Sequence, residues 1–83
     1  METRLAFIGI VVGNREATAR LNELLHEYGQ YIIGRMGIPY KHKDVSIISV
    51  MIDAPQDIIS ALTGKLGMLP AVSAKTTYPQ MPS

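Results

Sequence analysis

Few side chains in this sequence have the chemistry of a catalytic or metal-binding group. The chain contains no cysteine and two histidines, His26 and His42, so thiolate nucleophiles, disulfides and cysteine-based zinc or iron–sulfur sites are excluded. His26 and Glu23 have a spacing that can chelate a metal on one helical face, but two exposed ligands bind weakly, and a solvated helix face is the preferred interpretation. Serine, histidine and acidic residues occur without a nucleophile elbow to position them. We therefore expect no catalytic residue, no metal ligand and no cofactor.

Two basic segments could contact an anion. His42 lies between Lys41 and Lys43, and this cluster could contact a phosphate, although a solvated hairpin tip is the preferred interpretation. The Gly-Lys-Leu-Gly stretch at 64–67 lacks the spacing of a phosphate-binding loop. It also falls at the end of a predicted helix, where the macrodipole disfavours phosphate. Gly64 could instead allow close packing of that helix against a strand or another subunit.

Gly13, Asn14 and Arg15 form the strongest candidate for a ligand-binding site. They are expected at the start of the first helix, where free backbone N–H groups attract carboxylates. Arg15 could pair with such an anion. The alternative interpretation is an ordinary capped turn without a ligand.

The composition is that of one small globular domain. Of 83 residues, 47% are hydrophobic and 18% are charged, and we expect a single domain over residues 1–77 followed by a flexible tail at 78–83. The formal net charge of +1 gives no strong basic field, so direct binding to nucleic acid is not expected.

The longest apolar run, residues 5–12, is the one segment that could indicate a membrane span or a secretory signal. It is far shorter than the roughly 20 residues that span a bilayer, so we expect no membrane segment. It resembles the hydrophobic part of a secretory signal, but Arg15 and Glu16 lie where a cleavage region should be uncharged. We therefore expect a cytoplasmic protein.

Hydrophobic periodicity predicts an alternation of strands and helices. The strands are expected at residues 4–12, 30–36 with an extension toward 40, 45–52 and 71–77, and the helices at 15–28 and 55–66. Asn14 is expected to cap the first helix and Gly29 to end it, while Asp53 and Gln56 resemble a capping box for the second. This order is typical of an α+β, ferredoxin-like βαββαβ sandwich, in which two helices cover one face of an antiparallel four-stranded sheet.

The predicted strands are apolar on both faces, although two helices can cover only one face. We expect the uncovered face to be an oligomer interface that includes Phe7, Tyr31, Ile33 and Ile47, in a homodimer or homotetramer. The alternative is that these residues reflect only the preference of strands for β-branched side chains. Arg35 is expected on an exposed face, at an interface or at a sheet edge.

Several stretches resemble a known family. They are Leu-Asn-Glu-Leu-Leu-His at 21–26, Arg-Met-Gly-Ile-Pro at 35–39, the junction from Val11-Val12 to Arg15-Glu16, and Ile-Ser-Ala-Leu-Thr-Gly-Lys-Leu-Gly at 59–67 leading into Ala-Val-Ser-Ala-Lys at 71–75. Over about residues 4–76 the sequence is similar to the small stand-alone proteins known as iron-only hydrogenase system regulators. That family is related in fold to ACT domains and to the effector-binding domain of nickel-responsive repressors.

The resemblance implies an oligomeric module that binds a small effector near the strand-to-helix turn at a subunit interface. It implies no nickel ligand here, because the repressors use several histidines and a cysteine. Their ribbon-helix-helix DNA reader is also not expected, since the first strand begins at about residue 4.

Together these observations predict a regulatory protein without catalytic activity. Its expected partners are further copies of itself and either a small anionic effector or a partner regulatory protein. Two alternatives stay open. One is a transcriptional regulator that binds DNA directly through Arg15, Arg20, Lys41 and Lys43, and the other is a purely structural oligomer.

Overall fold

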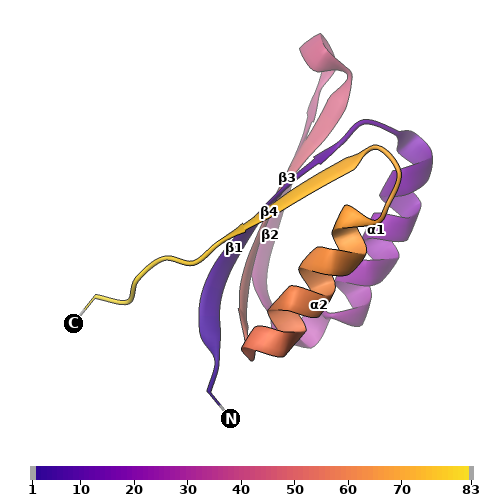
Figure 1. Ribbon diagram of the computed structural model, residues 1–83. Helices are drawn as coiled ribbons and strands as arrows, with labels where there is room; N and C mark the ends of the chain where they lie inside the picture. Colours follow the sequence, from indigo (N-terminus) through magenta and orange to yellow (C-terminus); the bar gives the residue numbers. More distant parts are fainter. Residues whose placement is uncertain (1, 83) are drawn as a thin grey trace.

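A computed structural model describes residues 2–82. Its strands are β1 (Arg4–Val12), β2 (Ile32–Tyr40), β3 (Val45–Ala54) and β4 (Val72–Thr77), and its helices are α1 (Arg15–Glu27) and α2 (Gln56–Gly67). The strands form one sheet in the order β2-β3-β1-β4, and all neighbouring strands are antiparallel. Both helices cover the same face of the sheet (Figure 1). This arrangement is the predicted ferredoxin-like βαββαβ sandwich.

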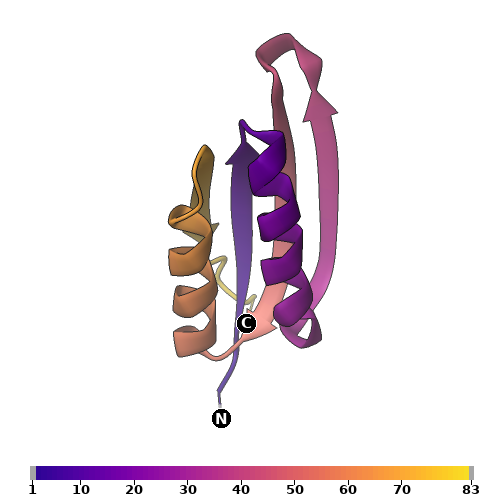
Figure 2. The same cartoon turned by 90° about the vertical axis from the view of Figure 1, so that its right-hand side faces the viewer.

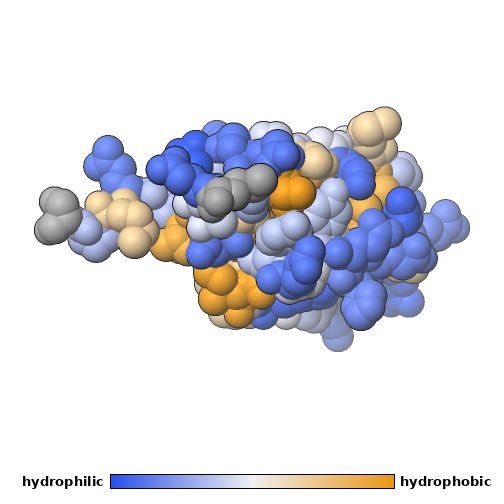
Figure 3. Space-filling model, turned by 90° about the horizontal axis from the view of Figure 1, so that it is seen from below, coloured by the Kyte–Doolittle hydropathy of each residue, from blue (hydrophilic) through white to orange (hydrophobic). Residues whose placement is uncertain are grey.

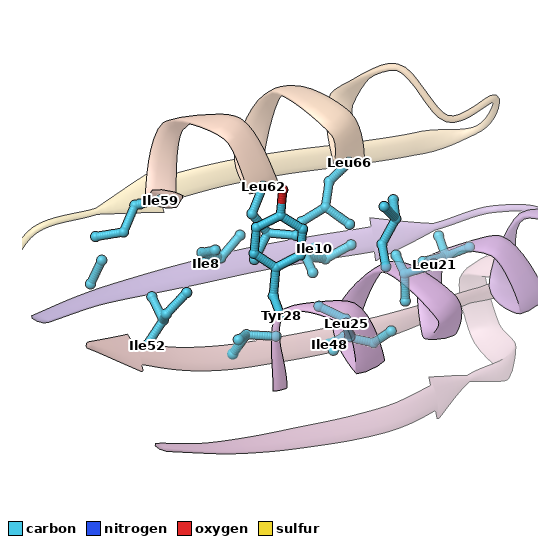
Figure 4. Packing of buried hydrophobic residues seen from close by; sticks show 14 of the residues in the cluster. Ile8, Ile10, Leu21, Leu25, Tyr28, Ile48, Ile52, Ile59, Leu62 and Leu66 are labelled. Carbon is cyan, nitrogen blue, oxygen red and sulfur yellow. The ribbon is translucent and has the colours of Figure 1, made fainter. Parts of the chain in front are cut away.

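The core lies between the sheet and the helices because each central strand turns alternate residues toward them. Ile8 and Ile10 of β1 are buried against Leu62 and Leu66 of α2 and against the buried leucines of α1 (Figure 4). Each fully buried aliphatic side chain of this kind contributes about 1.5–3 kcal/mol relative to an exposed one. These residues hold the two helices in fixed positions on the sheet.

The first helix begins as predicted and ends differently. The Oδ1 atom of Asn14 accepts a 2.7 Å hydrogen bond from the backbone N–H of Glu16, so the predicted cap is confirmed. At the other end Tyr28, not Gly29, is the cap, and a 3₁₀ turn at Gly29–Tyr31 follows. Because this turn takes up three residues, β2 begins at Ile32 instead of residue 30.

The predicted capping box of the second helix does not form. β3 continues to Ala54, which pairs with Arg4, so Asp53 is still part of the strand. Pro55 occupies the cap position and makes no side-chain hydrogen bond there. The Gln56 side chain instead accepts a 2.6 Å hydrogen bond from Arg4 and donates a 2.7 Å hydrogen bond to the Tyr78 hydroxyl.

The hairpin of β2 and β3 extends beyond the ends of the helices, and we call its outer part, residues 38–47, the arm (Figure 2). Its tip is a 3₁₀ turn at Lys41–Lys43 that closes at Asp44, whose φ of 52° is left-handed. The predicted turn at 41–44 is therefore present.

The sheet face away from the helices, which we call the open face, is largely apolar. Its residues are those whose register sets them opposite the helix-facing residues of each strand. The large exposed ones are Phe7 and Val11 of β1, Met36, Ile38 and Tyr40 of β2, and Ile47 of β3. The prediction that the strands are apolar on both faces is thus confirmed for β1 and β3.

The chain end is tied to the body at Tyr78. The Arg4 guanidinium lies 4.0 Å from the centroid of the Tyr78 ring, in addition to the contact of that ring's hydroxyl with Gln56. Residues 79–82 have no helix or strand and are exposed. Figure 3, the view from below, shows hydrophobic side chains at the base of this projecting segment and mostly hydrophilic ones toward the helices.

Candidate functional site

A pocket of about 390 Å³ lies between the turn that joins β1 to α1 and the base of the arm. Its lining includes all three residues predicted to bind a ligand, Gly13, Asn14 and Arg15. The further lining residues are Val12, Thr18, Pro39, Tyr40, Lys41, Asp44, Val45 and Ser46. The two walls meet because β3 pairs with β1, with Val12 opposite Ser46.

Three contacts fix the β1–α1 wall of the pocket. The backbone N–H of Gly13 donates a 2.8 Å hydrogen bond to the carbonyl of Ala71 in the α2–β4 loop. The Asn14 side chain caps α1, and the hydroxyl of Thr18 donates a 3.4 Å hydrogen bond back to the Asn14 carbonyl. Arg15 is the first residue of α1, so its side chain starts at the positive end of the helix dipole.

The charges that line the pocket favour a negatively charged ligand. Arg15 and Lys41 bring two positive side chains to opposite walls, and the amino end of α1 adds its partial positive charge. One carboxylate, that of Asp44, also lines the pocket at the arm tip. Such a set is suited to electrostatic recognition of an anion.

The two histidines lie apart from this pocket lining. His26 is exposed in the last turn of α1, and His42 lies at the arm tip with its ring 5.7 Å from that of Tyr40. Within residues 2–82, no group of three or more histidine or acidic side chains is arranged to hold a metal ion. No helix in this part of the chain is long and apolar enough to cross a membrane.

The residues predicted for the oligomer interface lie at three places in the structure. Phe7 and Ile47 both lie on the open face, where they are 48% and 44% exposed. Ile33 is exposed beside the irregular register of β2 between Ile32 and Gly34. Tyr31 lies in the 3₁₀ turn and packs against the core, so it does not join the open face.

Four large open-face residues, Val11, Met36, Ile38 and Tyr40, were not among those predicted for the interface. Met36 is 60% exposed and Ile38 is 53% exposed, and they pair with Ser49 and Ile47 of β3. Alternation counted from Ile33 sets them on the other face, because the irregularity in β2 shifts the count by one residue. Gly34 in the predicted strand was the available signal of such a bulge.

Arg35 has a specific partner within the chain. It lies on β2, an edge strand of the sheet, so one of its three predicted positions is confirmed. Its Nη2 donates a 2.9 Å hydrogen bond to Oδ1 of Asn22 on α1. This contact joins the edge strand to the helix.

Comparison with known proteins shows the family to which the chain is similar. Residues 4–76 match the model of the TM1266-like family, described as "Iron-only hydrogenase system regulator, putative". The solved structure of TM1266 from Thermotoga maritima has 35% sequence identity to this chain and a TM-score of 0.91. The similarity covers 95% of this chain and 100% of that one. None of the curated proteins compared with the sequence matches it.

Two more distant structures show the same fold only. A formyltetrahydrofolate deformylase from Pseudomonas putida KT2440 has 14% identity and a TM-score of 0.64, over 90% of this chain and 29% of that one. The divalent ion tolerance protein CutA1 from Ehrlichia chaffeensis has 14% identity and a TM-score of 0.54, over 100% of this chain and 88% of that one. The family model and the similarity to TM1266 confirm the resemblance found in the sequence. The chain belongs to the TM1266-like family.

Proposed function

We propose that this chain is a regulatory module that binds a small anion in the pocket beside α1 and self-associates through the open face. The observation that carries the proposal is the pocket between the β1–α1 turn and the arm. Gly13, Asn14 and Arg15 line it on the side of the turn, and Lys41 lines it on the side of the arm. The family description as a regulator supports a role in control. The mechanism is linkage, in which a ligand favours the assembly that binds it more tightly.

The arm connects the two surfaces of this proposal. Tyr40 and Val45 line the pocket, and they also pair with each other at the outer end of the open face. A ligand that draws Lys41 toward Arg15 therefore shifts residues that belong to the self-association surface. This gives a physical path by which pocket occupancy can change the assembly.

Anion binding is tested by calorimetry with inorganic phosphate and with succinate as probes. We expect one of these anions to bind, and Arg15→Ala and Lys41→Ala each to weaken that binding about tenfold, as the loss of a charge-assisted contact implies. Arg20→Ala is the matched control, because Arg20 is on the same helix but outside the pocket lining. Failure of both anions to bind at millimolar concentration, or equal effects of all three variants, would refute the proposed pocket.

Self-association is tested by analytical ultracentrifugation over a range of protein concentrations. We expect Ile38→Asp to shift the protein to monomer, because it introduces a charge into an apolar contact. Met68→Asp is the control, since Met68 is 85% exposed and lies outside the open face. A wild-type protein that remains monomeric at all concentrations contradicts this part of the proposal.

Direct DNA binding through Arg15, Arg20, Lys41 and Lys43 has weaker support. Arg20 Nη1 lies 3.1 Å from a carboxylate oxygen of Glu23 and 3.9 Å from one of Glu27, so its charge is partly neutralised. This leaves a smaller basic surface than the sequence suggested, which lowers the expected electrostatic attraction to phosphate groups.

A further inference from the structure

The open face carries one acidic and one basic side chain among otherwise uncharged residues. Among the open-face positions of the four described strands, Asp53 of β3 and Lys75 of β4 are the charged ones. Both are exposed, and neither forms an ion pair within residues 2–82. A partner that covers the open face must therefore accommodate both charges.

The sheet register fixes the positions of these two residues relative to each other. Asp53 pairs with Leu5 of β1, and Lys75 pairs with Gly9 of the same strand. The two charges are thus separated by two strand spacings across the sheet, about 10 Å, and by four residues along it, about 14 Å. β1 runs between β3 and β4, and the residue midway between Leu5 and Gly9 is Phe7.

We infer that two copies pack open face to open face about a two-fold axis at Phe7, with Lys75 of each copy paired to Asp53 of the other. This inference rests on the self-association proposed above and specifies its geometry. In a face-to-face dimer the axis lies in the plane between the two sheets. For Lys75 of each copy to face Asp53 of the other, this axis must cross the line that joins the two residues at its midpoint, which the register sets at Phe7. The two Phe7 side chains then meet at the centre, between two equivalent ion pairs.

The cost of burying charge favours this arrangement over other face-to-face packings. A packing that covers Asp53 or Lys75 without an opposite charge leaves a desolvated ion, which costs several kcal/mol. The reciprocal pairing gives each ion a partner by one symmetry operation. Phe7 and its cross-strand neighbour Met51 make the centre apolar on the β3 side, and the uncharged Thr77 lies on the β4 side.

A hollow next to Asp53 leaves room for the partner's lysine. A cavity of about 460 Å³ is lined by Asp53, Leu5, Arg4 and the chain end, including Tyr78 and Met81, and the Arg4 guanidinium in it contacts Gln56 and the Tyr78 ring. Asp53 is exposed on this lining. The long Lys75 stem could lie along the apolar part of the cavity while its ammonium group reaches the carboxylate.

Charge reversal tests the ion pairs. By ultracentrifugation, we expect Lys75→Glu and Asp53→Lys each to weaken the dimer at least tenfold, and the double variant to return to within about threefold of wild type. Lys43→Glu is the control, because it makes the same charge change at the arm tip. A double variant as weak as the single variants would overturn the pairing.

Cross-linking tests the axis independently. Since the chain has no cysteine, Phe7→Cys and Val11→Cys each introduce a single thiol. We expect a short bifunctional maleimide to link the Phe7→Cys dimer in high yield. Val11 lies about 14 Å farther along β1, away from the axis, so its variant should not be linked. The reverse pattern, or equal linking of both variants, would overturn the inference.

The outcomes separate this geometry from the proposed function. If the wild type is monomeric, self-association fails and the inference fails with it. The other case is a wild-type dimer that Ile38→Asp dissociates. If the double charge-reversal variant then stays as weak as the single variants and the Phe7→Cys protein is not cross-linked, the open face is an interface with a different axis.

Discussion

The backbone N–H of Gly13 donates a 2.8 Å hydrogen bond to the carbonyl of Ala71, and Ala71 has a left-handed φ of 60°. The contact joins the loop before β4 to the turn before α1, which forms one wall of the pocket. A Cβ atom on Gly13 would lie 3.7 Å from that carbonyl oxygen and 3.9 Å from the Cβ of Ala71. The position of the turn proposed to bind the ligand thus depends on a residue with a left-handed backbone conformation.

Replacing Ala71 by glycine should stabilise the protein. Ala71→Gly relieves the left-handed strain at the cost of greater unfolded-state entropy, and we expect a net gain of about 0.5–1 kcal/mol in the free energy of unfolding. Urea denaturation measures this change. The control is Ala61→Gly on the exposed side of α2, which should lose about 1 kcal/mol. A loss of stability in Ala71→Gly would show that the Ala71 methyl group contributes more to the free energy of unfolding than the left-handed backbone costs.

Two substitutions at Asn14 separate the cap from the ligand. Asn14→Ala removes the acceptor of the Glu16 N–H and should lower the free energy of unfolding by about 1 kcal/mol. Asn14→Asp retains the acceptor and adds a negative charge to the pocket lining, so it should keep stability and weaken anion binding several-fold. Denaturation and calorimetry on the same samples report both effects. Unchanged anion binding in Asn14→Asp would argue that the ligand does not approach α1.

The contact of Tyr78 with Arg4 and Gln56 predicts a boundary for truncation. Tyr78→Ala removes the cation–π contact and the hydrogen bond from Gln56, and we expect a loss of about 1–2 kcal/mol. Deleting residues 79–83 should change the free energy of unfolding by less than about 0.5 kcal/mol, because the described part of that segment is exposed. Thermal denaturation followed by circular dichroism distinguishes the two. A truncation as costly as Tyr78→Ala would mean that the tail itself packs on the domain.

The fold could be predicted because its signals are local. The short runs of apolar, largely β-branched residues in β1 and β3 and the helical spacing of apolar residues in α1 and α2 depend on neighbouring residues alone. The predicted capping box of α2 was wrong for a non-local reason. Gln56 bonds to Arg4 and Tyr78, which lie at the two ends of the chain, and these contacts compete with a capping box.

Only one wall of the pocket, the β1–α1 turn, could be predicted from the sequence. Gly13, Asn14 and Arg15 were identified from the turn chemistry and the helix amino end, which are contained in consecutive residues. Lys41 and Asp44 line the same pocket because β3 lies beside β1 in the sheet and carries the arm to that turn. Strand order is a property of the folded sheet, so no single segment of sequence specifies it.

Replacing a core residue by alanine should lower the free energy of unfolding far more than replacing an open-face residue. Leu62 is fully buried, and Leu62→Ala should cost about 2–5 kcal/mol. Ile38 is 53% exposed, so Ile38→Ala should change the stability of the monomer by about 0.5 kcal/mol or less. Denaturation at low protein concentration, which favours the monomer, measures both. A large loss in Ile38→Ala under these conditions would show that the open face supports the fold of the single chain.

Gly64 provides a test of which surface is used for assembly. It lies inside α2, where glycine costs about 1 kcal/mol relative to alanine. Apart from the neighbouring backbone of α2, no atom of residues 2–82 lies within 4 Å of a Cβ added at Gly64, so packing against a strand of the same chain does not require a glycine there. We expect Gly64→Ala to raise the free energy of unfolding by about 0.5–1 kcal/mol. Because α2 is on the opposite side of the sheet from the open face, the same variant should leave the dimer dissociation constant unchanged. If Gly64→Ala stabilises the monomer but weakens the dimer, α2 would instead lie at the contact between subunits. Close approach of another subunit would then explain why the helix has a glycine at this position in spite of its cost in stability.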